Sequence, residues 1–281
     1  MSRAVTGAAG RTLTGVVAAS AAAGVYGLLR RRTDAALQRT NRAGRTVTLY
    51  AGPAAVIGTA AGLAVAPGPP RERLAGVLAV LAAGGCGAYD DLMGADDPRR
   101  GFRAHLGALR RGEVTSGAVK LIGIGAAGLA AGLLVEERAV DGVLTGVVAA
   151  GTAHLVNLVD VTPGAAVGCV ALLGAAGAVG AARPAGAAGG ATAVAPLAVA
   201  GVLAPADLGE RAMLGDTGAH ALGAALGLAL ARCAGRSGRL GRVALVAGVV
   251  AAAADGDRVS RLARRVPRMR RHATGDAGAG R

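Results

Sequence analysis

The strongest constraint on the fold is the length of the apolar segments. The sequence alternates apolar blocks of about 15 to 21 residues with short polar stretches, and roughly 20 apolar residues let a helix cross the hydrocarbon core of a membrane. The 48 glycines would weaken helices in water, but small residues let membrane helices approach each other closely. The pattern therefore predicts an all-α, polytopic membrane protein.

About nine transmembrane helices are expected, in a single transmembrane domain over residues 1–255. The expected spans are 13–29, 46–66, 73–89, 118–135, 139–156, 164–182, 190–206, 218–233 and 241–255. The N-terminal segment also has the composition of a signal peptide, but the Arg-rich loop that follows it favours a first span. Residues 256–281 are expected to form a basic, disordered cytoplasmic tail.

The net charge of +14 fits membrane topology better than nucleic-acid binding. Binding to single-stranded nucleic acid uses aromatic side chains for stacking, whereas this chain has one Phe, three Tyr and no Trp. Cytoplasmic loops of membrane proteins carry an excess of Lys and Arg. With loop 30–45 in the cytoplasm, most basic residues lie on that side, and Arg236, Arg239 and Arg242 are exceptions. We therefore expect a multi-pass plasma-membrane protein that binds no nucleic acid.

This orientation places the acidic clusters on the cytoplasmic side. Asp90 and Asp91 end the third expected span, Asp160 follows the fifth, and Asp207 and Asp216 flank the loop before the eighth. A charge at mid-bilayer costs about 2.5–3.5 kcal/mol on insertion scales, so a position at a helix end has a structural explanation. The cost of burying a charge does not explain why nearly all of these carboxylates lie on the same side of the membrane. Carboxylates can hold Mg²⁺ together with substrate phosphates.

Two motifs add further polar groups to this face. Asn157 and Asp160 are three residues apart, so a helical turn would place them on one side. The alternative without a functional role is a turn at Pro163 and Gly164 that connects two spans. The segment 215–218, Gly-Asp-Thr-Gly, precedes an apolar run, so Asp216 or Thr217 would cap the next helix. The amides of that helix N-terminus would also suit an anion. The three motifs together predict a functional site.

GAYDD (87–91), NLVD (157–160) and MLGDTG (213–218) occur in an order that resembles the polyprenyl-phosphate sugar-1-phosphate transferase superfamily. This glycosyltransferase family 4-like group includes phospho-N-acetylmuramoyl-pentapeptide transferase and the polyprenyl-phosphate N-acetylglucosamine-1-phosphate transferases. The most specific stretch is MLGDTGAHALGAALG, and the loop TNRAGRTVTLYAG (40–52) is similar to the family's first cytoplasmic loop. The resemblance covers residues 40–230, roughly.

The resemblance implies a reaction at the cytoplasmic face that depends on Mg²⁺, with Mn²⁺ as an alternative ion. A polyprenyl phosphate would attack the β-phosphorus of a UDP-sugar, release UMP and leave a lipid-diphosphate-sugar for cell-envelope glycan synthesis. By motif, Asp90, Asp91 and Asp216 would be catalytic, and Asp216 and Asp91 would bind the metal. The implied substrate-binding residues are Asn157, Asp160, Lys120, Arg42, Arg45, Gly215 and Thr217.

Departures from the family pattern leave other functions open. Val161 and Pro163 replace the Gly and the second Asp of the family's NxxDGxDG motif, and the last cytoplasmic region is Arg-rich instead of His-rich. One alternative is a homologue without catalytic activity that binds lipid phosphate or a partner. Another is an unrelated transporter, which would place ionisable residues at mid-membrane. Whether the chain forms a homodimer is left open.

Overall fold

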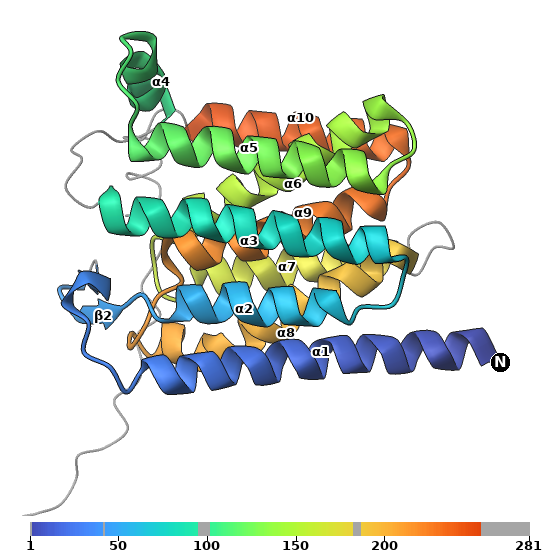
Figure 1. The fold of residues 1–281 in the computed structure, drawn as a ribbon, viewed down its shortest axis with the longest axis horizontal. Helices are drawn as coiled ribbons and strands as arrows, with labels where there is room; N and C mark the ends of the chain where they lie inside the picture. The colour runs from blue at the N-terminus through green and yellow to red at the C-terminus, as the bar shows by residue number, and fades with distance from the viewer. Residues whose placement is uncertain (1, 42, 95–101, 182–186, 254–281) are drawn as a thin grey trace, which may run out of the picture.

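The computed structural model describes residues 2–41, 43–94, 102–181 and 187–253 (Figure 1). Within these ranges the chain is mostly helical, with α1 (Ser2–Leu29), α2 (Ala51–Ala64), α3 (Pro70–Met93), α4 (Phe102–Arg110), α5 (Ser116–Val135), α6 (Ala139–Val159), α7 (Ala165–Ala181), α8 (Ala187–Leu208), α9 (Gly215–Arg232) and α10 (Arg236–Ala253). The short 3-10 helix η1 (Ala35–Leu37) leads into an antiparallel hairpin of β1 (Gln38–Thr40) and β2 (Thr46–Thr48). Arg42 and the expected tail 256–281 lie outside the described residues.

Four helices of the described chain are long and apolar enough to cross a membrane. Their apolar segments are Gly7–Leu29, Ser116–Val135, Ala139–Val159 and Gly189–Leu208. Large apolar side chains on these helices stay exposed on the surface of the bundle, such as Leu28, which is 66% exposed. Exposed apolar surface of this kind suits contact with lipid. The helices therefore indicate a membrane protein.

The long helices run back and forth between two ends of one bundle (Figure 1). One end, which we call the hairpin end, contains residues 30–50, 90–94, 111–116, 160–164 and 209–214. The opposite end, which we call the far end, contains residues 65–69, 136–138 and 233–235. Because successive helices alternate in direction, the acidic motifs at the ends of α3, α6 and α8 all lie at the hairpin end.

Helix α9 is the centre of the bundle. It packs against α2, α3, α6, α7 and α8, and nearly all of its residues are buried. Glycines allow the close approach of α6: a Cβ added at Gly223 or Gly227 would lie 2.6 Å from the Cα atom of Ala153 or Ala149. Since α9 begins at the hairpin end, this central position surrounds Asp216 with the ends of other helices.

Each expected span overlaps one helix, but some boundaries were wrong. Residues 46–48, expected inside the second span, form strand β2, because the β-branched Thr46, Val47 and Thr48 pair with β1. The expected loop 90–117 contains the last turn of α3 and the short helix α4. Over the described ranges four helices qualify as membrane spans, so nine crossings stay a prediction.

Candidate functional site

Two carboxylates meet one ammonium where α3, α5 and α9 come together at the hairpin end. Lys120, one turn into α5, places its Nζ atom 2.6 Å from Oδ2 of Asp90 and forms a second ion pair with Asp216. Ser116, the first residue of α5, lies close to the Asp90 carboxylate. The three charged side chains are 17–23% exposed, so the cluster is shielded but still reachable from the surface.

Asp91 caps helix α9 from the neighbouring helix α3. Its Oδ1 accepts a hydrogen bond from the Asp216 amide (3.1 Å), and its Oδ2 accepts from the Thr217 amide (2.9 Å) and hydroxyl (2.6 Å). The first amides of a helix lack partners within the helix, and a carboxylate there is favoured by the helix dipole. The expectation that Asp216 or Thr217 caps α9 is therefore wrong, because the cap position is Leu214 and Asp91 supplies the acceptor.

Asp160 also reaches the start of α9, from a position just beyond the end of α6. The helix ends at Val159, and Asp160 has non-helical backbone angles (φ −73°, ψ 52°). The backbone from Asn157 to Asp160 still makes one turn, so the expected alignment of the two side chains stays a prediction. Asn157 lies in the last turn of α6, where its carbonyl accepts a hydrogen bond from the Asp160 amide (3.1 Å), and the Asp160 carboxyl lies near the Gly215 amide.

The surroundings of Asp160 favour its protonated form. Burial, reinforced by the nearby carboxylates of Asp207, Asp216 and Asp91, raises the pKa of Asp160 to about 8. Its Oδ2 atom is buried and has no hydrogen-bond partner in the described part of the chain. The raised pKa and the unpaired oxygen together indicate that this side chain is a neutral carboxylic acid at pH 7.

The anion site expected at the N-terminus of α9 is filled by side chains of the protein itself. The amides of Asp216 and Thr217, in the first turn of the helix, donate to Asp91, and the Gly215 amide lies near the Asp160 carboxyl. Gly215 has a φ of +60°, and a Cβ there would lie 3.0 Å from the Asp91 carboxylate. A substrate phosphate would reach these amides only by displacing a carboxylate, so substrate contacts by Gly215 and Thr217 stay a prediction.

The hairpin lies against the segment that leads into α9. The Thr48 amide donates to the Arg211 carbonyl (3.3 Å), and the Thr48 carbonyl accepts from the Met213 amide (2.9 Å). Arg39 in β1 donates to the backbone carbonyl of Asp91, a contact that the sequence did not predict. Arg45, expected to bind substrate, forms an ion pair of 3.4 Å with Glu210, and its contact with substrate stays a prediction.

Two histidines without an assigned role contact each other beside this cluster. The rings of His154 and His220 pack edge to face with centroids 5.2 Å apart. His220 Nδ1 lies 2.7 Å from the Asp216 carbonyl oxygen, while the Nε2 atoms of both rings are buried and unpaired among the described residues. The spacing of Asp216 and His220, four residues apart on one helix, is the signal that links His220 to the site.

The residues at the cluster suit a hard cation. Mg²⁺ binds carboxylate oxygens and completes its shell with water or substrate phosphates, and Asp90 and Asp216 already converge on one cation, the Lys120 ammonium. No three His, Cys, Asp or Glu side chains of the described chain form a metal-binding group. Asp90 and Asp216 could therefore hold Mg²⁺ together with substrate oxygens; Asp91 as a metal ligand stays a prediction.

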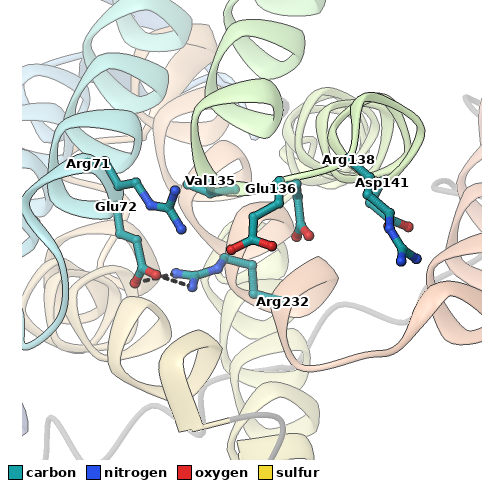
Figure 2. A pocket seen from close by; sticks show the side chains of 8 residues that line it. Arg71, Glu72, Val135, Glu136, Arg138, Asp141 and Arg232 are labelled. Atoms are coloured by element: carbon teal, nitrogen blue, oxygen red, sulfur yellow. Dashed lines mark hydrogen bonds and ion pairs between the residues drawn. The ribbon is translucent and has the colours of Figure 1, made fainter.

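A separate pocket of about 370 Å³ lies at the far end (Figure 2). It is lined by Arg71, Glu72, Val135, Glu136, Glu137, Arg138, Asp141 and Arg232. Arg232 of α9 and Glu72 of α3 form a two-pronged ion pair in it, with distances of 2.8 and 2.5 Å. None of the predicted site residues lines this pocket, so it is distinct from the cluster at the hairpin end.

The three arginines that depart from the expected charge bias all have hydrogen-bonding or ionic partners at the far end. Arg236 pairs with Asp141 (2.8 Å), and Arg239 pairs with Glu136 (3.0 Å). Arg242 donates to a backbone carbonyl, that of Leu230. Because the positive-inside rule counts Lys and Arg whether or not acidic residues pair with them, these three arginines remain exceptions to the expected charge bias.

The comparisons do not place the chain in a family. No protein-family model matches it, and no curated protein matches its sequence. The function is therefore argued from the geometry at the hairpin end, where Asp90, Asp91, Lys120, Asp216 and Thr217 come together as neighbours.

Proposed function

We propose that the chain is a membrane transferase that moves a sugar-1-phosphate from a UDP-sugar to a polyprenyl phosphate and releases UMP. The meeting of Asp90, Lys120 and Asp216 at one end of the bundle carries this proposal. These residues come from α3, α5 and α9, far apart in the sequence, and two of them lie in the motifs that resemble the transferase superfamily. A structural role alone would not bring both motifs to one ammonium.

The chemistry of phosphoryl transfer fits such a cluster, because catalysis consists largely of positioning and charge neutralisation. Asp90 would orient the lipid phosphate and accept its proton, and Lys120 would contact the diphosphate of the nucleotide-sugar. Asp216 would hold Mg²⁺ or Mn²⁺ together with Asp90, whose carboxylate converges on the same point, or with Asp91 as the resemblance implies; the ion when bound would neutralise charge on the diphosphate. Asn157 and Asp160 would contribute to the nucleotide-sugar site.

The proposal includes a topology with nine spans and the hairpin end in the cytoplasm. The excess of basic residues expected on that side supports this orientation, and nucleotide-sugars are cytoplasmic metabolites in such a reaction. The polyprenyl phosphate would reach the site from the surrounding membrane. The enzyme would thus join a soluble donor to a lipid acceptor at the plasma membrane.

The test is an assay of the purified protein with undecaprenyl phosphate, Mg²⁺ and a panel of UDP-sugars, in which released UMP is measured. We expect at least one UDP-sugar to be used, and Asp216→Asn to lower the rate by about 100-fold or more, as for loss of one charge-stabilising group. Glu113→Gln, an exposed carboxylate at the same end, is the matched control and should leave the rate unchanged. Folded protein that releases no UMP with any nucleotide-sugar would contradict the proposal.

A homologue without catalytic activity is the second candidate. It is favoured by Pro163, which stands where the family motif has its second Asp, and by Lys120, which already pairs with both carboxylates. Retention of polyprenyl phosphate by folded protein that releases no UMP would support it. The transporter is less well supported, because the clustered carboxylates lie at helix ends instead of mid-membrane.

A further inference from the structure

We infer that Lys120 and a divalent cation exclude each other from the place between Asp90 and Asp216, so that Lys120 must leave before the metal binds. The inference rests on the proposed function for the use of a divalent cation. It adds a regulation of that site: the protein carries its own competing cation on α5.

The position of the ammonium supports this competition. Its Nζ atom lies 2.6 Å from Asp90 Oδ2 and is also paired with Asp216, so it occupies the point where both carboxylates converge. A divalent cation held by the same two carboxylates would lie within a few ångströms of this positive charge, and repulsion at such a distance is strong in a shielded site. The two cations are therefore not expected to bind together.

The identity of the residue also supports it. Lys120 is the only lysine in a chain whose other basic residues are all arginines. An ammonium is a compact, strongly hydrated point charge on a flexible stem, whereas a guanidinium is a broad planar fork. Of the two, the ammonium more closely resembles a single metal ion between two carboxylates, and its stem allows it to move away.

The neighbouring carboxylate of Asp91 gives a displaced Lys120 no equivalent partner. Both oxygens of Asp91 are engaged with the start of α9. The anionic diphosphate of a nucleotide-sugar would be the alternative partner. Donor binding and metal binding should therefore favour each other, since coupling between two ligands is reciprocal.

The single lysine allows a direct test on the wild-type protein. Detergent-solubilised full-length chain is treated with an amine-acetylating reagent, with and without Mn²⁺, and modification of Lys120 is followed by mass spectrometry with the N-terminal amine as reference. We expect saturating Mn²⁺ to raise the rate of Lys120 acetylation at least about fivefold relative to the N-terminal amine. In the Asp216→Asn variant, Mn²⁺ should no longer raise the rate of Lys120 acetylation. An unchanged or slower Lys120 rate with Mn²⁺ would overturn the inference.

A second experiment measures the competition between Lys120 and the metal as a change in the affinity for Mn²⁺. Mn²⁺ binding is followed by electron paramagnetic resonance of free Mn²⁺, without lipid or nucleotide-sugar. We expect Lys120→Met to bind Mn²⁺ about tenfold more tightly or better, and Lys120→Arg, which keeps the charge, to bind as weakly as wild type. Lys120→Gln replaces Lys120→Met if that variant does not fold. Equal or weaker Mn²⁺ binding by the folded neutral variants would overturn the inference.

These measurements are independent of the UMP assay. Tighter Mn²⁺ binding by Lys120→Met in a protein that releases no UMP would support the competition and contradict the transferase. UMP release by wild type, with Mn²⁺ binding unaffected by Lys120→Met, would support the transferase and overturn the competition.

Discussion

Asp90 and Asp91 are neighbours in the sequence, but their side chains have different surroundings. Consecutive residues of a helix point roughly 100° apart, so Asp90 faces the Lys120 ammonium while Asp91 faces the start of α9. Asp91 accepts three hydrogen bonds there, whereas Asp90 shares a cation with Asp216. At the scale of single residues, one carboxylate thus holds two helices together and the other forms an ion pair with Lys120.

Loss of the Asp91 carboxylate should destabilise the protein. Asp91→Ala leaves the amides of Asp216 and Thr217 without their acceptor, and a buried unsatisfied donor costs about 1–3 kcal/mol. We expect the free energy of unfolding in detergent to fall by that amount, measured by denaturant titration. Asp90→Ala should cost less, because Lys120 keeps its ion pair with Asp216. Equal stabilities of wild type and Asp91→Ala would contradict the capping role.

The raised pKa of Asp160 makes stability depend on pH. Unfolded Asp has a pKa of about 3.9, whereas burial raises the folded value to about 8. Between these values the unfolded chain loses the proton and the folded chain keeps it, so stability falls as the pH rises, by at most about 1.4 kcal/mol per unit.

The matched variant for this effect is Asp160→Asn, which cannot ionise. We expect wild type to lose stability relative to Asp160→Asn between pH 5 and pH 8, with no further relative change above about pH 9. Unfolding free energies of both proteins across this range provide the measurement. Parallel pH profiles would show that Asp160 is ionised in the folded protein.

At the scale of elements, the close crossing of α3 and α9 positions the cluster. A Cβ added at Gly87 would overlap the backbone carbonyl of Asp216, so the absence of a side chain at Gly87 is what lets α3 lie against the start of α9. The same approach brings the end of α3 within reach of the α9 amides. The GAYDD motif therefore combines a packing residue with two functional carboxylates.

Gly87→Ala should force the two helices apart. Overpacking of a tight contact costs about 1–3 kcal/mol, and the shift would also separate Asp91 from its partners on α9. Gly85→Ala, in the same helix, is the control because its added Cβ would have no neighbour within 4 Å. We expect a lower melting temperature for Gly87→Ala only; similar values for both variants would argue against the close crossing.

The elements that the sequence failed to predict are the short ones. Strands β1 and β2 have three residues each, too few for an alternating pattern to stand out beside apolar blocks. Their stability depends on partners distant in sequence, since Thr48 bonds to Arg211 and Met213. The long helices were predictable because their composition already requires a buried or lipid-facing helix.

At the scale of the whole molecule, the two ends of the bundle should face opposite sides of the membrane. Val161 at the hairpin end and Val140 at the far end are 39% and 63% exposed, so each can carry a cysteine in a variant whose native Cys86, Cys169 and Cys233 are replaced. With an impermeant maleimide on intact cells, we expect Val140→Cys to be labelled and Val161→Cys to be labelled only after permeabilisation. Labelling of both in intact cells would contradict this topology.

The helical class, the approximate places of the long helices and the residues of the three acidic motifs could all be predicted from the amino-acid sequence. A backbone in lipid must satisfy its hydrogen bonds internally, so a long apolar segment predicts a helix. The different surroundings of the carboxylates follow from the packing of the helices and not from the sequence pattern. The capping of α9 by Asp91, the neutral state of Asp160 and the placement of Lys120 between Asp90 and Asp216 all depend on contacts between helices distant in sequence. Local pattern cannot specify such contacts, because they depend on how the helices cross.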